Sequence, residues 1–328
     1  MYTTFFSLDE NPFSISPNPR YLYKSSQHMD ALAHLMHGIA PDGCITLLTG
    51  DVGTGKTTIS RCFIEQVSES ATLGIIINPK ASGNELLNLV CKEFGISCSD
   101  DQPTSIPELV NQINNYLLDI YRGGGNAILL IDEAQNLDMD SLELLRLLTN
   151  LETDTHKLLK IILIGQPELK NILNREGFRQ INQRITSRFH LTPFSREDVA
   201  RYIQHRLQTA GGDKTDRFSK AAVREIHRIS SGIPRLINLL CNHCLIGAYA
   251  HGVARVNRTI VRRAAQEIFD ESMVTPSIFS RPSTIFLTLG LFGVMVVFIE
   301  YLLTGQSSLM RIKEQLVTLA SRFGALSP

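Results

Sequence analysis

Hydrophobic residues come in short continuous runs, separated by amphipathic segments, from about residue 44 to about residue 192. A run without polar alternation is typical of a strand of a parallel sheet, because such a strand is buried on both faces. We therefore predict strands at residues 44–49, 73–78, 127–132, 159–165 and 188–191. Other segments have the apolar period of helices, and we predict these at residues 57–69, 83–94, 106–121, 140–151 and 167–185. The alternation predicts an α/β fold, a doubly wound αβα domain.

The segments that flank this region have different patterns. Residues 1–24 are rich in Pro, Asn, Phe and Tyr and predict an irregular arm, and a helix is expected from Ser25 or Ser26 to just before Pro41. Beyond Pro193 the helical period continues with no strand between the helices, which predicts a small all-helical second domain. Its helices are expected at residues 196–210, 218–230, 234–250 and 257–270. The expected divisions are an arm with its helix at 1–42, the αβα domain at 43–192 and the helical domain at 193–272.

A long apolar run, TIFLTLGLFGVMVVFIEYLL, occupies residues 284–303. A helix needs about 20 such residues to span a bilayer core. The alternative, a buried core helix, normally has a polar face, which this run lacks. We predict a linker at 273–283, a transmembrane helix at 284–303 and a short tail at 304–328. Leucine, isoleucine and phenylalanine recur at spacings of three and four in the tail, which is consistent with a short coiled coil or an interfacial helix.

Composition narrows the function classes only a little. Lys and Arg together number 32, and so do Asp and Glu, so the chain is formally neutral. Neutrality argues against attraction of the whole protein to nucleic acid, although it leaves room for a local basic patch. The N-terminus has no basic start followed by an apolar core, so no secretory signal is expected.

Candidate chemistry begins with the sequence GDVGTGKT at residues 50–57, which matches the phosphate-binding pattern GxxxxGK[ST] between a predicted strand and a predicted helix. Glycines let the backbone wrap the phosphates, and the start of the helix adds a positive dipole. We expect Lys56 to reach the β- and γ-phosphates of ATP, Thr57 to bind Mg²⁺ and Thr58 to lie near the α-phosphate. The candidate cofactor-binding residues of the loop are Gly50, Asp51, Val52, Gly53, Thr54, Gly55, Lys56 and Thr57.

Two further strands end in polar residues. ILLIDEAQNL places Asp132 and Glu133 at the end of a strand, where ligands of open α/β sheets bind. Asp132 is expected to hold Mg²⁺ through its water shell, and Glu133 to polarise the attacking water, unless it is a plain surface carboxylate. KIILIGQPEL places Gln166 where its amide could contact the γ-phosphate or the water. A glutamine that only starts the next loop is the alternative.

Arginines complete the set of candidate residues. Arg179, Arg184 and Arg188 lie in FRQINQRITSRFHL, and Arg235 lies in SGIPRLINL. An arginine neutralises charge on the transferred phosphoryl group, and an arginine from a neighbouring subunit couples hydrolysis to assembly. Any one arginine, taken alone, is more often a solvated or ion-paired side chain.

These motifs together resemble the AAA+ ATPases, and more closely the A-component ATPases of the type II secretion accessory complex (the GspA/ExeA group), with the ATPase of mannose-sensitive haemagglutinin pilus biogenesis a near relative. The resemblance rests on FFSLDENPFSISPNPRYLYKSSQHMDALAHL, LLTGDVGTGKTT, LLIDEAQNL, IGQPEL and QRITSRFHL, and runs from residue 5 to about residue 270. It implies an AAA+ P-loop NTPase with a five-stranded parallel αβα sheet, a C-terminal helical lid and one transmembrane helix.

The resemblance also implies roles for individual residues. Lys56 and Thr57 correspond to Walker A, and Asp132 and Glu133 to Walker B. Gln166 corresponds to sensor 1 and Arg235 to sensor 2; Arg188 is the first choice for the arginine finger and Arg184 the second. Tyr21 and Tyr23 are candidates to frame the adenine, and simple packing of the arm is an equal alternative.

The resemblance implies partners and a location as well. We expect a homo-oligomeric ring, with six subunits as the expected number, a GspB-type membrane partner and indirect action on a secretin. Because the chain stops 25 residues after the apolar run, contact with peptidoglycan is expected only through a partner or a missing domain. The positive-inside rule weakly favours an inward tail, but the need for cytoplasmic ATP favours a single-pass inner-membrane protein with a periplasmic C-terminus.

Two other functions remain open from the sequence. One is a nucleotide-gated oligomeric scaffold with little turnover. The other is a DNA-binding AAA+ regulator of the transposition type, which the neutral charge and the apolar run disfavour, so no nucleic acid is expected. The best basic candidate for DNA is the cluster Arg255, Arg258, Arg262 and Arg263, which is more simply a solvated helix face.

Overall fold

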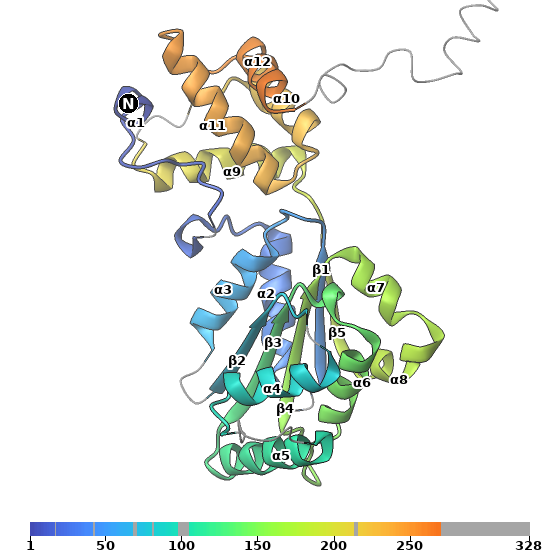
Figure 1. Cartoon of the computed structure of the whole chain (residues 1–328). Coiled ribbons are helices and arrows are strands. Elements are labelled where there is room, and N and C mark those ends of the chain that lie inside the picture. Colours follow the sequence, from blue (N-terminus) through green and yellow to red (C-terminus); the bar gives the residue numbers. More distant parts are fainter. Residues whose placement is uncertain are drawn as a thin grey trace, which may run out of the picture. The chain divides into compact units, whose positions relative to one another are not determined.

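The computed structural model describes residues 1–16, 18–41, 43–67, 71–80, 82–97, 105–212 and 216–269 (Figure 1). The described residues all belong to one unit, Met1–Asp270. The predicted linker, transmembrane helix and tail at residues 273–328 lie outside the described residues. Within the described part of the chain, no helix is both long and apolar enough to cross a membrane.

A single parallel sheet of five strands, in the order β2-β3-β4-β1-β5, forms the centre of the αβα domain. The strands are β1 Ile45–Gly50, β2 Ala71–Ile77, β3 Asn126–Asp132, β4 Leu159–Gly165 and β5 Ile185–Leu191. The predicted five-stranded α/β fold is therefore confirmed. Strand β5 begins three residues earlier than predicted, because its buried residues alternate with the exposed Thr186, Arg188 and His190. That alternation marks an edge strand, whereas the prediction relied on continuous apolar runs.

Helices cover both faces of the sheet (Figure 1). They are α2 Ser26–Gly38 and α3 Lys56–Gln66 on one face, and α4 Gly83–Glu93, α5 Ile106–Arg122 and α6 Met139–Leu148 on the other. Successive residues of a strand point to opposite faces, so Leu47 packs in the core beneath α4 to α6 and Leu48 in the core beneath α2 and α3. Apolar side chains pack on both faces of the sheet, and they hold in place the strand ends, where the candidate residues lie.

The prediction of one helix over residues 167–185 is wrong. The segment contains α7 Pro167–Leu173, a 3₁₀ turn Glu176–Phe178 and α8 Arg179–Gln183. Helix α7 ends at Leu173 with Asn174 as its C-cap, and Gly177 follows three residues after Asn174. Both residue types have low helix propensity, and the apolar period alone did not register these breaks. The irregular arm also contains short helical pieces, α1 Tyr2–Phe5 and a 3₁₀ turn Pro19–Tyr21.

The helical domain consists of α9 Arg196–Thr209, α10 Lys220–Ser230, α11 Pro234–Ala250 and α12 Arg258–Ile268. The beginning of the N-terminal arm is bound to these helices. The N–H of Asp9 donates to the carbonyl oxygen of Ala210 at 2.9 Å, and the guanidinium of Arg217 donates to the carbonyl oxygen of Phe6 at 2.8 Å. The arm therefore connects the helical domain to α2 of the αβα domain.

Two of the four arginines of the predicted basic cluster, Arg258 and Arg262, bind one carboxylate, together with Arg228 of α10. Glu225 of α10 is buried and accepts hydrogen bonds from Arg228, Arg258 and Arg262, at 2.9 to 3.0 Å for the shortest contact of each. Burial alone would raise the pKa of Glu225, but the three arginines outweigh it and lower the pKa to about 2. Arg258 and Arg262 thus join α12 to α10, so these two arginines are not simply a solvated face.

Candidate nucleotide site

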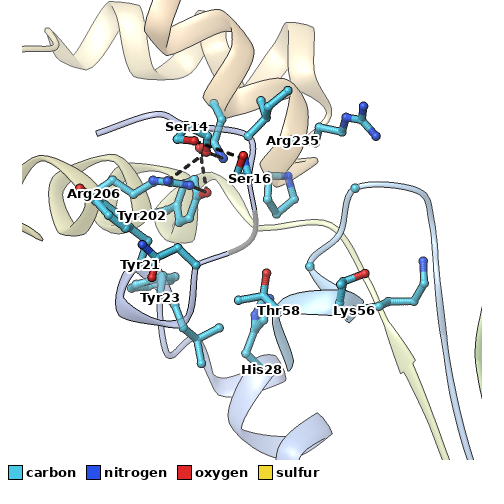
Figure 2. A pocket seen from close by; sticks show the side chains of 18 of the residues that line it. Ser14, Ser16, Tyr21, Tyr23, His28, Lys56, Thr58, Tyr202, Arg206 and Arg235 are labelled. Carbon is cyan, nitrogen blue, oxygen red and sulfur yellow. Dashed lines mark hydrogen bonds between the residues drawn. The ribbon is translucent and has the colours of Figure 1, made fainter. Parts of the chain in front are cut away.

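A cavity of about 330 Å³ lies at the carboxyl ends of the strands (Figure 2). It is lined by the loop between β1 and α3 with the first turn of α3, by residues of the arm between Ser14 and Tyr23, and by helices α9 and α11 of the helical domain, the predicted lid. His28 of α2 and Glu133 after β3 complete the lining. The predicted residues that line the cavity are Val52, Gly53, Gly55, Lys56, Thr57, Thr58, Glu133 and Arg235. Parts of the chain far apart in sequence therefore meet at one pocket.

The loop has the shape that its glycines allow. Gly53 and Gly55 have φ angles of +83° and +106°, a region that other residues rarely adopt. Thr54 closes the loop by donating its hydroxyl to the carbonyl oxygen of Asp51 at 2.8 Å. Helix α3 begins directly after Gly55, so the free N–H groups and the positive dipole of its first turn are available to an anion.

Lys56 is the buried cation of the site, with 7% of its surface exposed. Its ammonium donates to the carbonyl oxygens of Gly50 at 2.7 Å and Asp51 at 3.0 Å. Burial lowers the pKa of Lys56, and the nearby charges of Glu133 and Asp132 oppose this shift. The lysine thus lies in a partly desolvated position where a phosphate charge would be strongly attracted.

Asp132 and Thr57 bring two oxygen ligands together. The hydroxyl of Thr57 donates to Oδ2 of Asp132 at 3.4 Å, and the N–H of Glu133 donates to Oδ1 at 2.9 Å. Burial raises the pKa of Asp132, while the bond from Glu133 lowers it. A hydroxyl and a carboxylate beside phosphate-binding N–H groups are the oxygen donors that Mg²⁺ prefers, so these residues fit the predicted metal.

Glu133 follows β3 in the left-handed conformation, with φ at +55°. Its carboxylate oxygen Oε2 accepts two hydrogen bonds, from Nε2 of Gln135 at 2.5 Å and from Nε2 of Gln166 at 3.3 Å. Glu133 and Gln166, two separately predicted site residues, are thus brought together from the ends of β3 and β4. Gln166 also precedes α7, so it begins a helix as well as reaching the candidate base.

A buried histidine packs against the phosphate-binding loop at Gly55. His28 of α2 lies 3.0 Å from the position that a Cβ on Gly55 would occupy, and its Nδ1 is 2.7 Å from the hydroxyl of Ser25. Burial lowers the pKa of His28 to about 4, with a backbone bond at Thr54 and the charge of Asp198 acting in the opposite direction. His28 is therefore a neutral side chain that fills the space beneath Gly55.

The arm and the lid meet at a buried arginine beside the cavity (Figure 2). Arg206 of α9 donates to the carbonyl oxygens of Pro12 at 2.5 Å and Ser14 at 3.1 Å, and its guanidinium lies 4.7 Å from the ring centre of Tyr21. Burial and a hydrogen bond to Glu10 raise the pKa of Tyr21 to about 12. Tyr21 and Tyr23 both line the cavity and both pack within the protein, so the two sequence interpretations are compatible.

The two candidate finger arginines lie elsewhere. Arg188 is in the middle of edge strand β5, opposite Leu47, and donates to the backbone oxygen and the side chain of Asn182 at 2.8 and 2.6 Å. Arg184 precedes the strand and donates to Asn150 at 2.9 Å. Neither arginine lines the cavity.

Three contributors escaped the sequence analysis: His28, Gln135 and Arg206. Gln135 lies inside the quoted motif ILLIDEAQNL, so its closeness to Glu133 was a usable signal. His28 and Arg206 sit in ordinary amphipathic helices, and their contacts with the loop and the arm depend on the three-dimensional fold. No sequence pattern in those helices distinguishes them from surface residues.

Comparisons with known proteins agree with this geometry. A family model described as an AAA domain matches residues 42–173. General secretion pathway protein A of Aeromonas hydrophila is 47% identical over 268 residues, which cover 82% of this chain and 48% of that protein. The chain therefore spans about half the length of that relative.

Solved structures share the fold. Cdc6p of Pyrobaculum aerophilum has a TM-score of 0.62 at 18% identity and covers 80% of this chain and 72% of its own. The ORC2 protein of Aeropyrum pernix has a TM-score of 0.56 at 18% identity, with coverages of 79% and 71%. At such identities the likeness concerns the fold alone.

Proposed function

The chain belongs to the GspA-like AAA+ ATPases, and on this premise we propose that it binds ATP with Mg²⁺ and hydrolyses it at the subunit interfaces of a ring. The observation that carries the proposal is that Lys56, Thr57 and Glu133 line one cavity and that Thr57 contacts Asp132, in a chain that matches an AAA domain. Lys56 and the N–H groups of the loop bind the phosphates, and the arm and the lid enclose the rest of the nucleotide.

Each polar residue has a place in the proposed reaction. Thr57 and Asp132 hold Mg²⁺, which when bound neutralises phosphate charge. Glu133 takes a proton from water as the water oxygen bonds to the γ-phosphorus and the bond from that phosphorus to the β-phosphate oxygen breaks, leaving ADP and phosphate. Gln166 contacts the γ-phosphate or the water in this proposal, and Arg235 reaches the nucleotide from the lid. Because Arg188 and Arg184 lie outside the cavity of their own subunit, one of them, with Arg188 first, serves the neighbouring subunit.

We further propose a location and a task for the ring. The apolar residues 284–303 anchor the chain in the inner membrane, with the ATPase domain in the cytoplasm and the C-terminus in the periplasm. The likeness to General secretion pathway protein A supports a role in secretion. The task that we propose is in type II secretion or pilus assembly, with a GspB-type partner, action on a secretin and only indirect contact with peptidoglycan.

The chemistry is tested by turnover of the full-length protein. Lys56→Ala is expected to abolish nucleotide binding, and Glu133→Gln to retain binding while losing hydrolysis. Lys92→Ala, an exposed lysine of α4, is the matched control and should behave as wild type. Robust, unchanged hydrolysis by the first two variants would refute the assigned roles. Oligomer size measured with ATP, with ADP and without nucleotide separates an enzyme from a scaffold that assembles without turnover.

The anchor is tested separately, by cell fractionation. The full chain is expected in the inner-membrane fraction, and a chain that ends at residue 272 in the soluble fraction. Accessibility of a cysteine added after residue 328 to a membrane-impermeant label reports which side the tail occupies. Recovery of the full chain in the soluble fraction would remove the membrane part of the proposal and leave the ATPase part intact.

A further inference from the structure

The hydrogen bonds around Glu133 converge on a residue outside the predicted site, Gln135. Its side-chain amide uses both ends: Nε2 donates to Oε2 of Glu133 at 2.5 Å, and Oε1 accepts from the backbone N–H of Gln166 at 3.0 Å. Since a backbone N–H can only donate, the amide atom that faces it must be the oxygen. The orientation of the amide is therefore determined, and its N–H group is directed at the carboxylate.

The surrounding chain leaves room for this amide. Gln135 belongs to a short 3₁₀ turn, Ala134–Asn136, directly after Glu133. Its side chain crosses the end of β4 above Gly165, where an added Cβ would lie 2.9 Å from Oε1 of Gln135 and 2.8 Å from Leu169. A residue larger than glycine at position 165 would displace the amide or the leucine. The end of β4 is thus shaped to accept Gln135.

We propose that Gln135 is a positioning residue that joins the sensor position to the base. It holds the carboxylate of Glu133 by one oxygen and the backbone of Gln166 by the other end of its amide. Gln166 donates to the same Oε2 through its own side chain at 3.3 Å, so the three residues form a closed set of hydrogen bonds. The proposal rests on the proposed function, because orienting Glu133 matters only if Glu133 is the base that activates water.

These hydrogen bonds make the orientation of the Glu133 carboxylate depend on whether ATP occupies the site. When the side chain of Gln166 turns to the γ-phosphate, it gives up its bond to Glu133, and Gln135 alone still fixes Oε2. The carboxylate plane is then set by one short bond, and the other oxygen can accept from water. Without Gln135, Glu133 has a strained backbone but a side chain free to rotate, so fewer molecules have the base in position.

The test is single-turnover hydrolysis and nucleotide affinity in the full-length protein. Gln135→Ala is expected to slow hydrolysis by about 10- to 100-fold, the usual range for loss of a supporting hydrogen bond, and to change the Kd for ATP by no more than about twofold. Gly165→Ala reaches the same amide from another residue and should reproduce the split between rate and affinity. Gln135→Glu loses the donor and adds a charge, so it should not rescue the rate.

A matched control lies one residue away. Asn136 is in the same turn, but its amide donates to Asn78 at 2.7 Å, away from Glu133. Asn136→Ala should keep the wild-type rate, which separates loss of the turn from loss of the bond. The inference is overturned if Gln135→Ala hydrolyses ATP at the wild-type rate, or if its rate, affinity and melting temperature fall together. By contrast, a wild-type protein that does not hydrolyse ATP, or a fully active Glu133→Gln, refutes the proposed function itself.

Discussion

The backbone N–H of Arg235 donates to the carbonyl oxygen of Gly53 at 3.2 Å, so the first turn of lid helix α11 is bonded directly to the phosphate-binding loop. The two residues are also packed closely, because a Cβ on Gly53 would lie 2.7 Å from the Cβ of Arg235. A change in the conformation of the loop therefore acts directly on the first turn of α11. This contact links the two domains directly at the site.

We expect Gly53→Ala to weaken nucleotide binding at least 10-fold and to destabilise the protein by about 1–3 kcal/mol, because a left-handed backbone and a close neighbour both oppose the added methyl. Gly124→Ala is the matched control. Gly124 has a similar φ of +77°, but no heavy atom lies within 4 Å of its added Cβ. Nucleotide affinity and melting temperature of both variants give the comparison. Equal effects of the two substitutions would mean that the loop–lid contact contributes nothing.

His28 should make stability depend on pH between about 6.5 and 4. Its pKa is about 4 in the folded protein, against 6.5 usually, so the unfolded chain binds a proton in this window that the folded chain excludes. The free energy of unfolding therefore falls as the pH falls, by about 2 kcal/mol between pH 7 and pH 4.5. His28→Gln should reduce that slope, whereas His37→Gln, an exposed residue of the same helix, should not. Chemical unfolding at each pH measures the slopes, and identical slopes for wild type and His28→Gln would contradict the burial argument.

The sequence predicted the fold best for strands that are buried on both faces of the sheet. Strands β1, β3 and β4 are apolar almost throughout, so their sequences predict strands buried on both faces. Edge strand β5 was found only in part, because one of its faces is exposed and interrupts the apolar run. The breaks between α7 and α8 were missed because an apolar period continues through Asn174 and Gly177.

The sequence could predict those site residues that belong to a motif with a known chemical role. The motifs single out Lys56, Thr57 and Asp132 because backbone geometry near a phosphate restricts the residue types at each position, and their roles toward a nucleotide stay predictions. Gln135 and His28 act through contacts that form only when separate elements pack together. Arg206 shows the same limit, since its partners Pro12 and Ser14 belong to the other end of the chain.

Glu225 should act in a lower and separate pH window. Its pKa is about 2 in the folded protein, below the usual 4.5, so its contribution is complete above pH 4.5 and is lost as the pH falls toward 2. Glu225→Gln should cost about 1–3 kcal/mol at pH 7, since it removes the charge that three arginines share. That difference should shrink between pH 4.5 and pH 2.5. Glu197→Gln, an exposed lid residue, is the control, and a difference that stays constant with pH would exclude the proton linkage.

Arg188 offers a test of catalysis across subunits, since it lies outside the cavity of its own subunit. Arg188→Ala should bind ATP normally and lose most of its turnover, because the arginine serves the neighbouring site. Lys56→Ala should be inactive for the opposite reason, because it keeps Arg188 but lacks the lysine that binds the phosphates. Mixing the two inactive proteins should restore up to about a quarter of the wild-type rate, because some interfaces then pair an intact Lys56 with an intact Arg188. The same mixture made with Arg184→Ala decides between the two arginines. If neither mixture regains activity while the mixed rings assemble, neither arginine acts in trans.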